Sequence, residues 1–219
     1  MNKKIVSALL VVLCPSFANA EGVGGYIRGG ISSVGFEISD SAGDSLELDR
    51  GVGPSFVGGL QFANGIGVRA NYVKAGHKGG TACSGGCVSF SDNVDTSETR
   101  IGVLYSPKIQ QTVGFEVGLG LEALKLEDEK IDGPFLESAL LLKAGQITTI
   151  DIGLGIFDLE ADDGTGFEGA EFRLGALAKF SAGGEIGARV RRVHLENDDF
   201  GITTELDFTE IGITLGASF

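Results

Sequence analysis

The sequence predicts an all-β fold: one antiparallel up-and-down transmembrane β-barrel of ten strands, with eight as the alternative count. Three observations lead to this prediction. Apolar and polar residues alternate with a period of two in one segment after another, turn signals separate these segments, and glycine fills 36 of 219 positions. Glycine weakens helices but suits strands that bend around a closed barrel. After residue 20 there is no apolar run of about 18 residues from which a membrane-spanning helix could form.

The first 20 residues predict a secretory signal peptide that is removed from the mature protein. Lys3 and Lys4 give it a positive start, residues 5–13 are almost entirely apolar, and Ala18-Asn19-Ala20 fits the small-x-small cleavage rule. An apolar run of this length is too short to span a bilayer as a helix. We therefore expect a single domain, a β-barrel over residues 21–219.

The second expected strand, residues 52–62, shows the alternation most clearly, with mostly apolar side chains at even positions and small or polar ones at odd positions. Asn64-Gly65 then predicts a tight type I′ hairpin, whose two central residues need positive φ. The first strand, at about residues 22–38, is less regular, and Arg28 is expected on its inner face. The remaining alternating segments are 66–72, 99–106, 113–122, 136–143, 150–156, 170–180, 185–191 and 210–219.

The connections between these segments alternate between short turns and longer loops. Four connections are short and nearly free of acidic residues. Short periplasmic turns and longer external loops are typical of bacterial membrane barrels, so both termini are expected to face the periplasm. The five longer connections, which are mostly acidic, are 39–50, 77–96, 127–133, 160–168 and 195–203.

One face of the expected strands carries charges of both signs in nearly equal number, eight bases against seven acids. The acid excess behind the net charge of −13 lies instead in the long loops. Buried charges must pair, so this balance favours a charged interior and a lipid-facing apolar surface over the inverse arrangement of a soluble barrel. The expected lumen charges are Arg28, Arg69, Arg100, Glu116, Glu122, Glu137, Lys143, Asp151, Glu171, Arg173, Lys179, Glu185, Arg189, Arg191 and Glu210.

The end of the chain resembles the signal by which bacterial barrels are recognised for membrane insertion. Ile211, Ile213 and Leu215 alternate with small or polar residues, and the chain ends at Phe219. Together with the signal peptide and the repeated hairpins, this segment makes the chain similar to the small outer-membrane barrels of the OmpA-like and OmpX-like type. The resemblance implies an outer-membrane location, contact with lipid including lipopolysaccharide, and the barrel-insertion machinery as a partner of the last strand.

Two cysteines remain after the expected cleavage, and they predict a disulfide. Cys83 and Cys87 flank three small residues, and an even pair in an exported chain is usually oxidised. A zinc site is the alternative, but it would have to recruit carboxylates because His77 and His194 are the only histidines. Cys14 could carry a lipid instead of being removed, but the large residue before it disfavours that processing.

The sequence predicts no enzymatic activity, no catalytic residue and no cofactor. Some small barrels are proteases, lipid A deacylases, phospholipases or acyltransferases, and their chemistry needs a histidine that activates serine or water. The Asp-x-His pattern of the proteases is absent, and Leu195-Glu196 follows His194 where the deacylases have His-x-Ser. We interpret His194 and His77 as solvated loop residues.

The acidic loops raise the question of cations, and the net negative charge argues against nucleic acid as a partner. Carboxylates cluster at 127–129, 158–164 and 196–199, which suits weak binding of divalent cations, but none has the spacing of an EF-hand and no metal site is assigned. Bases near the expected outer rim can meet lipopolysaccharide phosphates. They are Lys74, Lys78, Lys125, Lys130 and Arg192.

The expected role is structural or surface-interacting, with a lumen filled by paired charges and acidic loops presented outside. A narrow porin-like channel for small solutes is the alternative. Inward glycines favour the channel because they remove bulk from the lumen, whereas paired long side chains favour a filled barrel.

Overall fold

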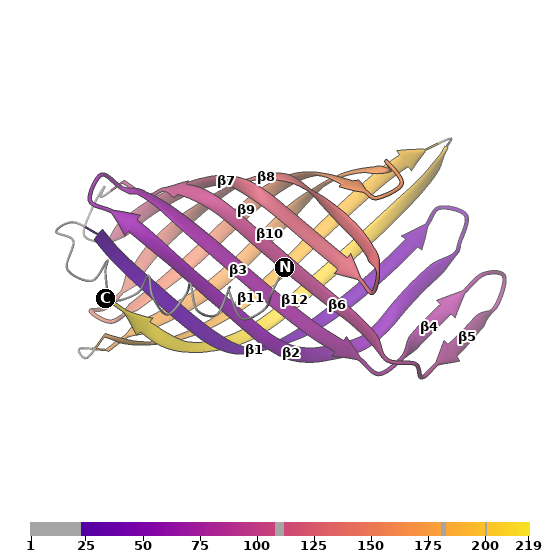
Figure 1. The fold of residues 1–219 in the computed structure, drawn as a ribbon, viewed down its shortest axis with the longest axis horizontal. Helices are drawn as coiled ribbons and strands as arrows, with labels where there is room; N and C mark the ends of the chain where they lie inside the picture. Colours follow the sequence, from indigo (N-terminus) through magenta and orange to yellow (C-terminus); the bar gives the residue numbers. More distant parts are fainter. Residues whose placement is uncertain (1–22, 108–111, 181–182, 200) are drawn as a thin grey trace, which may run out of the picture.

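The computed structural model describes residues 23–107, 112–180, 183–199 and 201–219, which form a closed antiparallel barrel of ten strands (Figure 1). β1 pairs with both β2 and β12, so the sheet has no open edge around the barrel. This confirms the predicted fold class and the count of ten. The barrel strands are β1 (Val23–Asp40), β2 (Ser45–Phe62), β3 (Ile66–His77), β6 (Val94–Tyr105), β7 (Val113–Leu126), β8 (Glu129–Ala144), β9 (Thr148–Ala161), β10 (Gly166–Lys179), β11 (Gly184–Asp199) and β12 (Ile202–Ser218).

The expected signal peptide, residues 1–20, and the alternative of a lipid on Cys14 lie outside the described residues. Within the described ranges, no helix has the length and apolar character that a membrane crossing requires.

The last strand closes the barrel onto the first. Ile31 of β1 lies opposite Ile213 of β12. The pairing continues to the chain end, where the Gly25 N–H donates to the Phe219 carbonyl at 2.8 Å and the Phe219 N–H donates back to the Gly25 carbonyl at 2.9 Å. The C-terminal residue is therefore part of the ladder that seals the barrel.

The barrel has two unlike ends (Figure 1). At the terminus end, on the left in the view, β1 begins, the chain ends, and short turns join the strands. One of these turns contains Gly65, which has φ of +87° and donates its N–H to the Phe62 carbonyl. Asn64 does not share the positive φ, so the predicted type I′ turn is wrong; the three-residue connection suits a turn that ends in a left-handed glycine.

At the opposite, hairpin end, the strands run much further than the sequence predicts. The segment 195–203, expected as a loop, belongs almost entirely to β11 and β12, which end at Asp199 and begin at Ile202. These extensions are acidic outside but apolar inside, as with the buried Leu195 and Leu206. The strands continue here because their inward side chains pack against a core, although their outward acidic residues suggest a loop.

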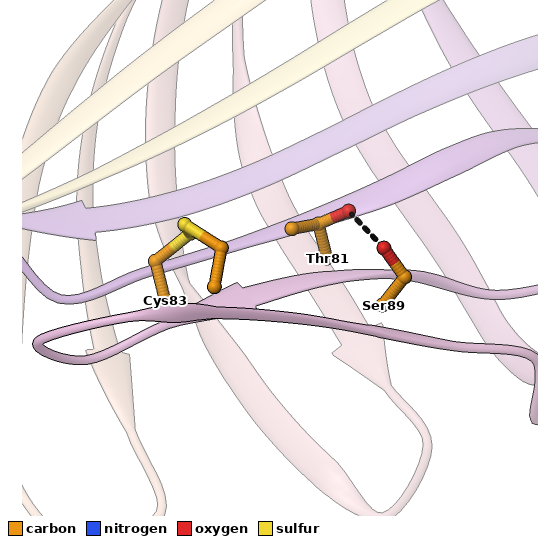
Figure 2. The surroundings of a disulfide bond; sticks show 4 residues. Thr81, Cys83 and Ser89 are labelled. Atoms are coloured by element: carbon orange, nitrogen blue, oxygen red, sulfur yellow. Dashed lines mark hydrogen bonds between the residues drawn. A yellow bond between two sulfur atoms is a disulfide. The ribbon is translucent and has the colours of Figure 1, made fainter.

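The segment 77–96 contains a further hairpin of two short strands, β4 (Gly80–Cys83) and β5 (Cys87–Phe90). β4 pairs with the start of β2, so this hairpin extends the barrel wall at the hairpin end. The predicted disulfide between Cys83 and Cys87 closes it, and Figure 2 shows this bond beside the 3.5 Å hydrogen bond between the Thr81 and Ser89 hydroxyls.

The outer surface carries a band of exposed apolar side chains around the middle of the barrel, which suits contact with lipid. The predicted outward residues of the last strand belong to this band, with Ile213 60% and Leu215 64% exposed. Other members are Ile31, Phe56, Ile101, Leu121, Leu154 and Phe172.

We predict that Cys87→Ala leaves the barrel intact. A disulfide that closes so short a loop contributes about 2 kcal/mol in the chain-entropy model, and this loop lies beyond the ten-stranded closure. The heat-modifiable shift of the folded barrel on a gel should be unchanged, while protease cleavage within 80–90 should become faster. Free-thiol labelling of the native wild type would contradict the pairing.

Candidate functional site

The lumen holds the charged residues predicted from the sequence. The alternation of the strands points these side chains inward, and most of them form ion pairs with one another across the barrel. Lys143 lies at the terminus end, where its side chain is exposed at the mouth of a lumen cavity.

Glu98 belongs to this group but was missed by the sequence analysis. It is fully buried and forms ion pairs with Arg191 and Arg100. Its position two residues before Arg100, on the same face of β6, was the available signal; the expected strand began at residue 99, one residue after Glu98, whereas β6 begins at Val94. With Glu98 included, the eight inward bases face eight inward acids, and the formal charge of the lumen is zero.

Arg191 and Arg100 form the centre of this lumen network, which we call the ionic layer. Arg191 donates Nε to Glu171 at 2.7 Å and Nη2 to Glu122 at 3.0 Å. Arg100 donates Nε to Glu122 at 2.7 Å and Nη2 to Glu171 at 2.6 Å. The two guanidinium groups therefore share the same two carboxylates, and together they tie β6, β7, β10 and β11 across the lumen.

A second set of ion pairs lies beside this centre. Arg69 donates Nη1 to Glu116 at 2.8 Å and also binds Glu137. Arg173 donates Nη1 to the same Glu137 at 2.9 Å and Nε to Asp151 at 3.2 Å. Glu137 on β8 thus links bases that come from β3 and β10.

A third set lies against β1 and β12. Arg189 donates Nη2 to Glu210 at 2.8 Å and to the Asn71 amide oxygen at 3.1 Å. The Ser32 hydroxyl donates to the same Glu210 oxygen at 2.7 Å. Two further bases, Arg28 at 3.1 Å and Lys179 at 2.9 Å, share the buried Glu185.

An apolar plug fills the lumen on the hairpin side of the ionic layer. The guanidinium carbon of Arg100 lies 4.6 Å from the ring centroid of Phe135 and 5.2 Å from that of Phe157, and that of Arg191 lies 5.6 Å from Phe208. Such contacts are favourable cation–π geometry. The plug comprises Val34, Phe36, Leu48, Val73, Ala75, Leu124, Phe135, Phe157, Leu159, Phe167, Val193, Leu195, Leu206 and Phe208.

Inward glycines make room for the ion pairs. A Cβ at Gly175 would lie 2.0 Å from Oδ2 of Asp151, and one at Gly153 would lie 3.0 Å from Nη2 of Arg173. The two glycines flank the same ion pair from neighbouring strands. The space that they leave is occupied by charged side chains and does not form a pore.

His77 is buried, so its interpretation as a solvated loop residue is wrong. It ends β3 and is 1% exposed. Its Nδ1 lies 2.6 Å from the Asp49 carbonyl, to which it donates, and its Nε2 lies 2.9 Å from the Thr96 hydroxyl. The ring therefore anchors the bend of β2 to β3 and β6.

His194 lies on the outer wall of β11, beyond the apolar band, and belongs to a strand where a loop was expected. Its ring nitrogens lie 2.9 Å from Glu196 and 3.3 Å from Asp207. The hydrogen bond with Glu196 raises the pKa of His194 above its ordinary value, with a smaller contribution from Asp207.

The bases expected at the outer rim are largely engaged with acids. Lys74 pairs with Asp95 at 2.6 Å and Arg192 with Asp207 at 3.0 Å. Lys130 likewise contacts Asp132 at 2.5 Å. Across the described ranges, no three His, Cys, Asp or Glu side chains are grouped so that they could hold a metal ion.

Comparison with known proteins identifies the family but no individual relative. A family model for the outer membrane protein beta-barrel domain matches residues 5–219. No curated protein matches the chain.

Two solved barrels are similar in fold. The outer membrane protease OmpT from Escherichia coli has a TM-score of 0.57 at 7% identity, over 92% of this chain and 98% of that one. The beta domain of the Bordetella autotransporter BrkA has a TM-score of 0.54 at 9% identity, over 91% of this chain and 100% of that one. At such identities the likeness concerns the fold alone. Together with the family match, the closed ten-stranded barrel and its apolar outer band show that this chain belongs to the outer membrane protein β-barrel family of bacteria.

Proposed function

We propose that this protein is a closed, non-enzymatic barrel with a structural or surface-interacting role in the outer membrane. The observation that carries the proposal is the pair of barriers stacked inside the lumen, the ionic layer and the apolar plug. A ten-stranded barrel is only slightly wider than an eight-stranded one, which side chains can just fill. Here the central side chains of both barriers are less than one-tenth exposed.

The alternative, a narrow porin-like channel, needs a continuous polar path from one end to the other. The lumen contains a cavity of about 990 Å³ at the terminus end, but Arg100 and Arg191 form its inner limit. Beyond them lie the phenylalanine rings of the plug. Inward glycines would favour a pore, but Gly153 and Gly175 lie against the charged side chains of Arg173 and Asp151.

The orientation follows from the two unlike ends. We place the terminus end in the periplasm and the hairpin end outside, because the strand extensions and the hairpin β4–β5 make the hairpin end project further, as the external side of bacterial barrels usually does. The outside then presents acidic strand extensions and the disulfide-closed hairpin β4–β5, on which Val88 is 69% exposed. This projecting surface is the part of the molecule suited to a partner.

The last strand is suited to the barrel-insertion machinery. Ile211, Ile213, Leu215 and Phe219 all point outward and are exposed, so their side chains are accessible before the barrel meets lipid. At the opposite rim, Lys78 and Lys125 are exposed bases that can meet lipopolysaccharide phosphates.

The absence of enzymatic activity is part of this proposal. OmpT is a protease, but at 7% identity only its fold is relevant here. In the hydrolytic barrels named above, catalysis needs a histidine against a nucleophile or a water. The ring of His77 is used to join strands, and that of His194 is held between two carboxylates on the outer wall, beyond the apolar band.

Arg191→Ala should lower the free energy of unfolding by about 3–5 kcal/mol, because three buried carboxylates lose one of their two shared bases and only Arg100 remains against them. Its neighbour Arg192 provides a matched control: it points outward, its side chain is 65% exposed, and it pairs with Asp207. Arg192→Ala should change stability by less than about 1 kcal/mol. Denaturant unfolding in lipid vesicles measures both. Equal effects of the two substitutions would contradict the claim that the buried ion pairs of the lumen stabilise the barrel.

Wild-type protein in planar bilayers should show no long-lived channels. Replacing Phe135, Phe157 and Phe208 together by alanine removes the rings behind the ionic layer and should produce an ion leak. The control Phe172→Ala removes an outward ring of the same kind, which is 50% exposed, and should not leak. Large, stable channels in the wild type would overturn the closed barrel and favour the porin-like alternative.

A further inference from the structure

The cavity at the terminus end has walls of a different charge from the lumen as a whole. It extends from Arg100 and Arg191, at the ionic layer, to the turn residues Pro107 and Gln146 at the mouth. Its volume of about 990 Å³ lies in the range of small-molecule sites, which is about 300–1,000 Å³. The closed-barrel proposal makes no use of this space.

Bases line the cavity and acids largely do not. All eight inward bases contribute to the lining, but of the eight inward acids only Glu116 and Asp151 do so. The other six carboxylates are at most 5% exposed, since the bases cover them. The lumen is formally neutral, yet its surface toward the cavity is positive. A cleft walled by one sign of charge and low-dielectric material concentrates its field on an entering ion.

Several of these bases retain hydrogen-bonding capacity toward the cavity. Arg28 contacts Glu185 through Nε and lies over the Tyr26 ring, and the described residues provide no hydrogen-bond acceptor for its two Nη groups. Arg189 uses Nε and Nη2 for Glu210 and Asn71, which leaves Nη1. Lys143 forms no ion pair with the described residues. Guanidinium groups match carboxylate and phosphate oxygens especially well.

Toward its mouth, the cavity has apolar lining residues beside the base Lys143. Val57, Leu141 and Leu177 are lining residues on inward positions of β2, β8 and β10, and Ile147 lies in the turn beside them. A fully hydrated inorganic ion would gain nothing from these side chains. An anion with an apolar part would place its charge against the bases and bury the apolar part here.

We propose that this cavity binds a small organic anion, with a carboxylate or phosphate group against the basic floor and an apolar group against Leu141 and Leu177. The site goes beyond the proposed role of the barrel, because a closed barrel needs no ligand. If no organic anion binds, the closed-barrel proposal is unaffected. If the wild type instead forms open channels, the closed barrel is wrong, and the binding experiment still decides on this site.

Methyl NMR of the protein in zwitterionic nanodiscs tests the assignment. The probes are phenyl phosphate, benzoate, inorganic phosphate and uncharged benzyl alcohol, and the signals are the Leu141 and Leu177 methyl groups. Phenyl phosphate or benzoate should produce saturable shifts, and comparing the two identifies the preferred anionic group. Inorganic phosphate should bind more weakly and benzyl alcohol should not saturate. Saturation by benzyl alcohol at the same concentrations, or no saturation by either organic anion, would overturn the proposal.

Two substitutions locate the site. Lys143→Gln removes an exposed charge at the mouth and should weaken binding of the better organic anion about fivefold, which corresponds to about 1 kcal/mol of binding free energy. Lys130→Gln makes the same change at the hairpin end and should have no effect. Equal effects of the two would show general charge attraction and overturn the site. Leu177→Ser should reduce the preference for phenyl phosphate over inorganic phosphate; an unchanged preference would overturn the role of the apolar mouth.

Discussion

The pairing of charges inside a closed barrel is the constraint on which the rest of this structure depends. Closure places every second side chain of ten strands in a space from which bulk water is largely excluded, and a charge there needs a partner. The pairs join distant parts of the chain: Glu98 meets Arg191 across 93 residues and Arg100 meets Glu171 across 71. A shift of one residue in any strand would turn its charges toward lipid. The network therefore fixes register as well as filling space.

The two halves of the lumen are filled differently: the hairpin side by apolar side chains and the terminus side only in part. On the hairpin side, apolar side chains pack behind the ionic layer, and aromatic rings such as Phe135 and Phe208 cover the guanidinium groups. On the terminus side, the bases face a cavity and their carboxylate partners lie behind them. This asymmetry makes a barrel that is blocked toward one end and hollow toward the other.

Much of the fold could be predicted because its signals are local. A period of two identifies the inner and outer faces, turn residues separate the strands, and two nearby cysteines indicate a hairpin closure. The balance of signs on the charged face predicts an interior position, and in the structure these side chains point into the lumen. The apolar plug was not predicted, because the outer surface of the hairpin end is acidic. In β11, Arg192, His194 and Glu196 alternate with the buried Val193 and Leu195, and a segment judged by its charges looks like a loop. The burial of His77 and the positive walls of the cavity depend on contacts between distant strands, which no local pattern contains.

A double-mutant cycle on Arg191 and Glu122 tests the mutual dependence of the buried charges most directly. Their side chains lie 3.0 Å apart and are 2% and 0% exposed. Arg191→Met, Glu122→Gln and the double variant would be compared by denaturant unfolding in vesicles. If the two charges depend on each other, the double variant is less destabilised than the sum of the single variants, by about 0.5–3 kcal/mol. Additive losses would contradict the ionic layer as the interaction that holds the barrel together.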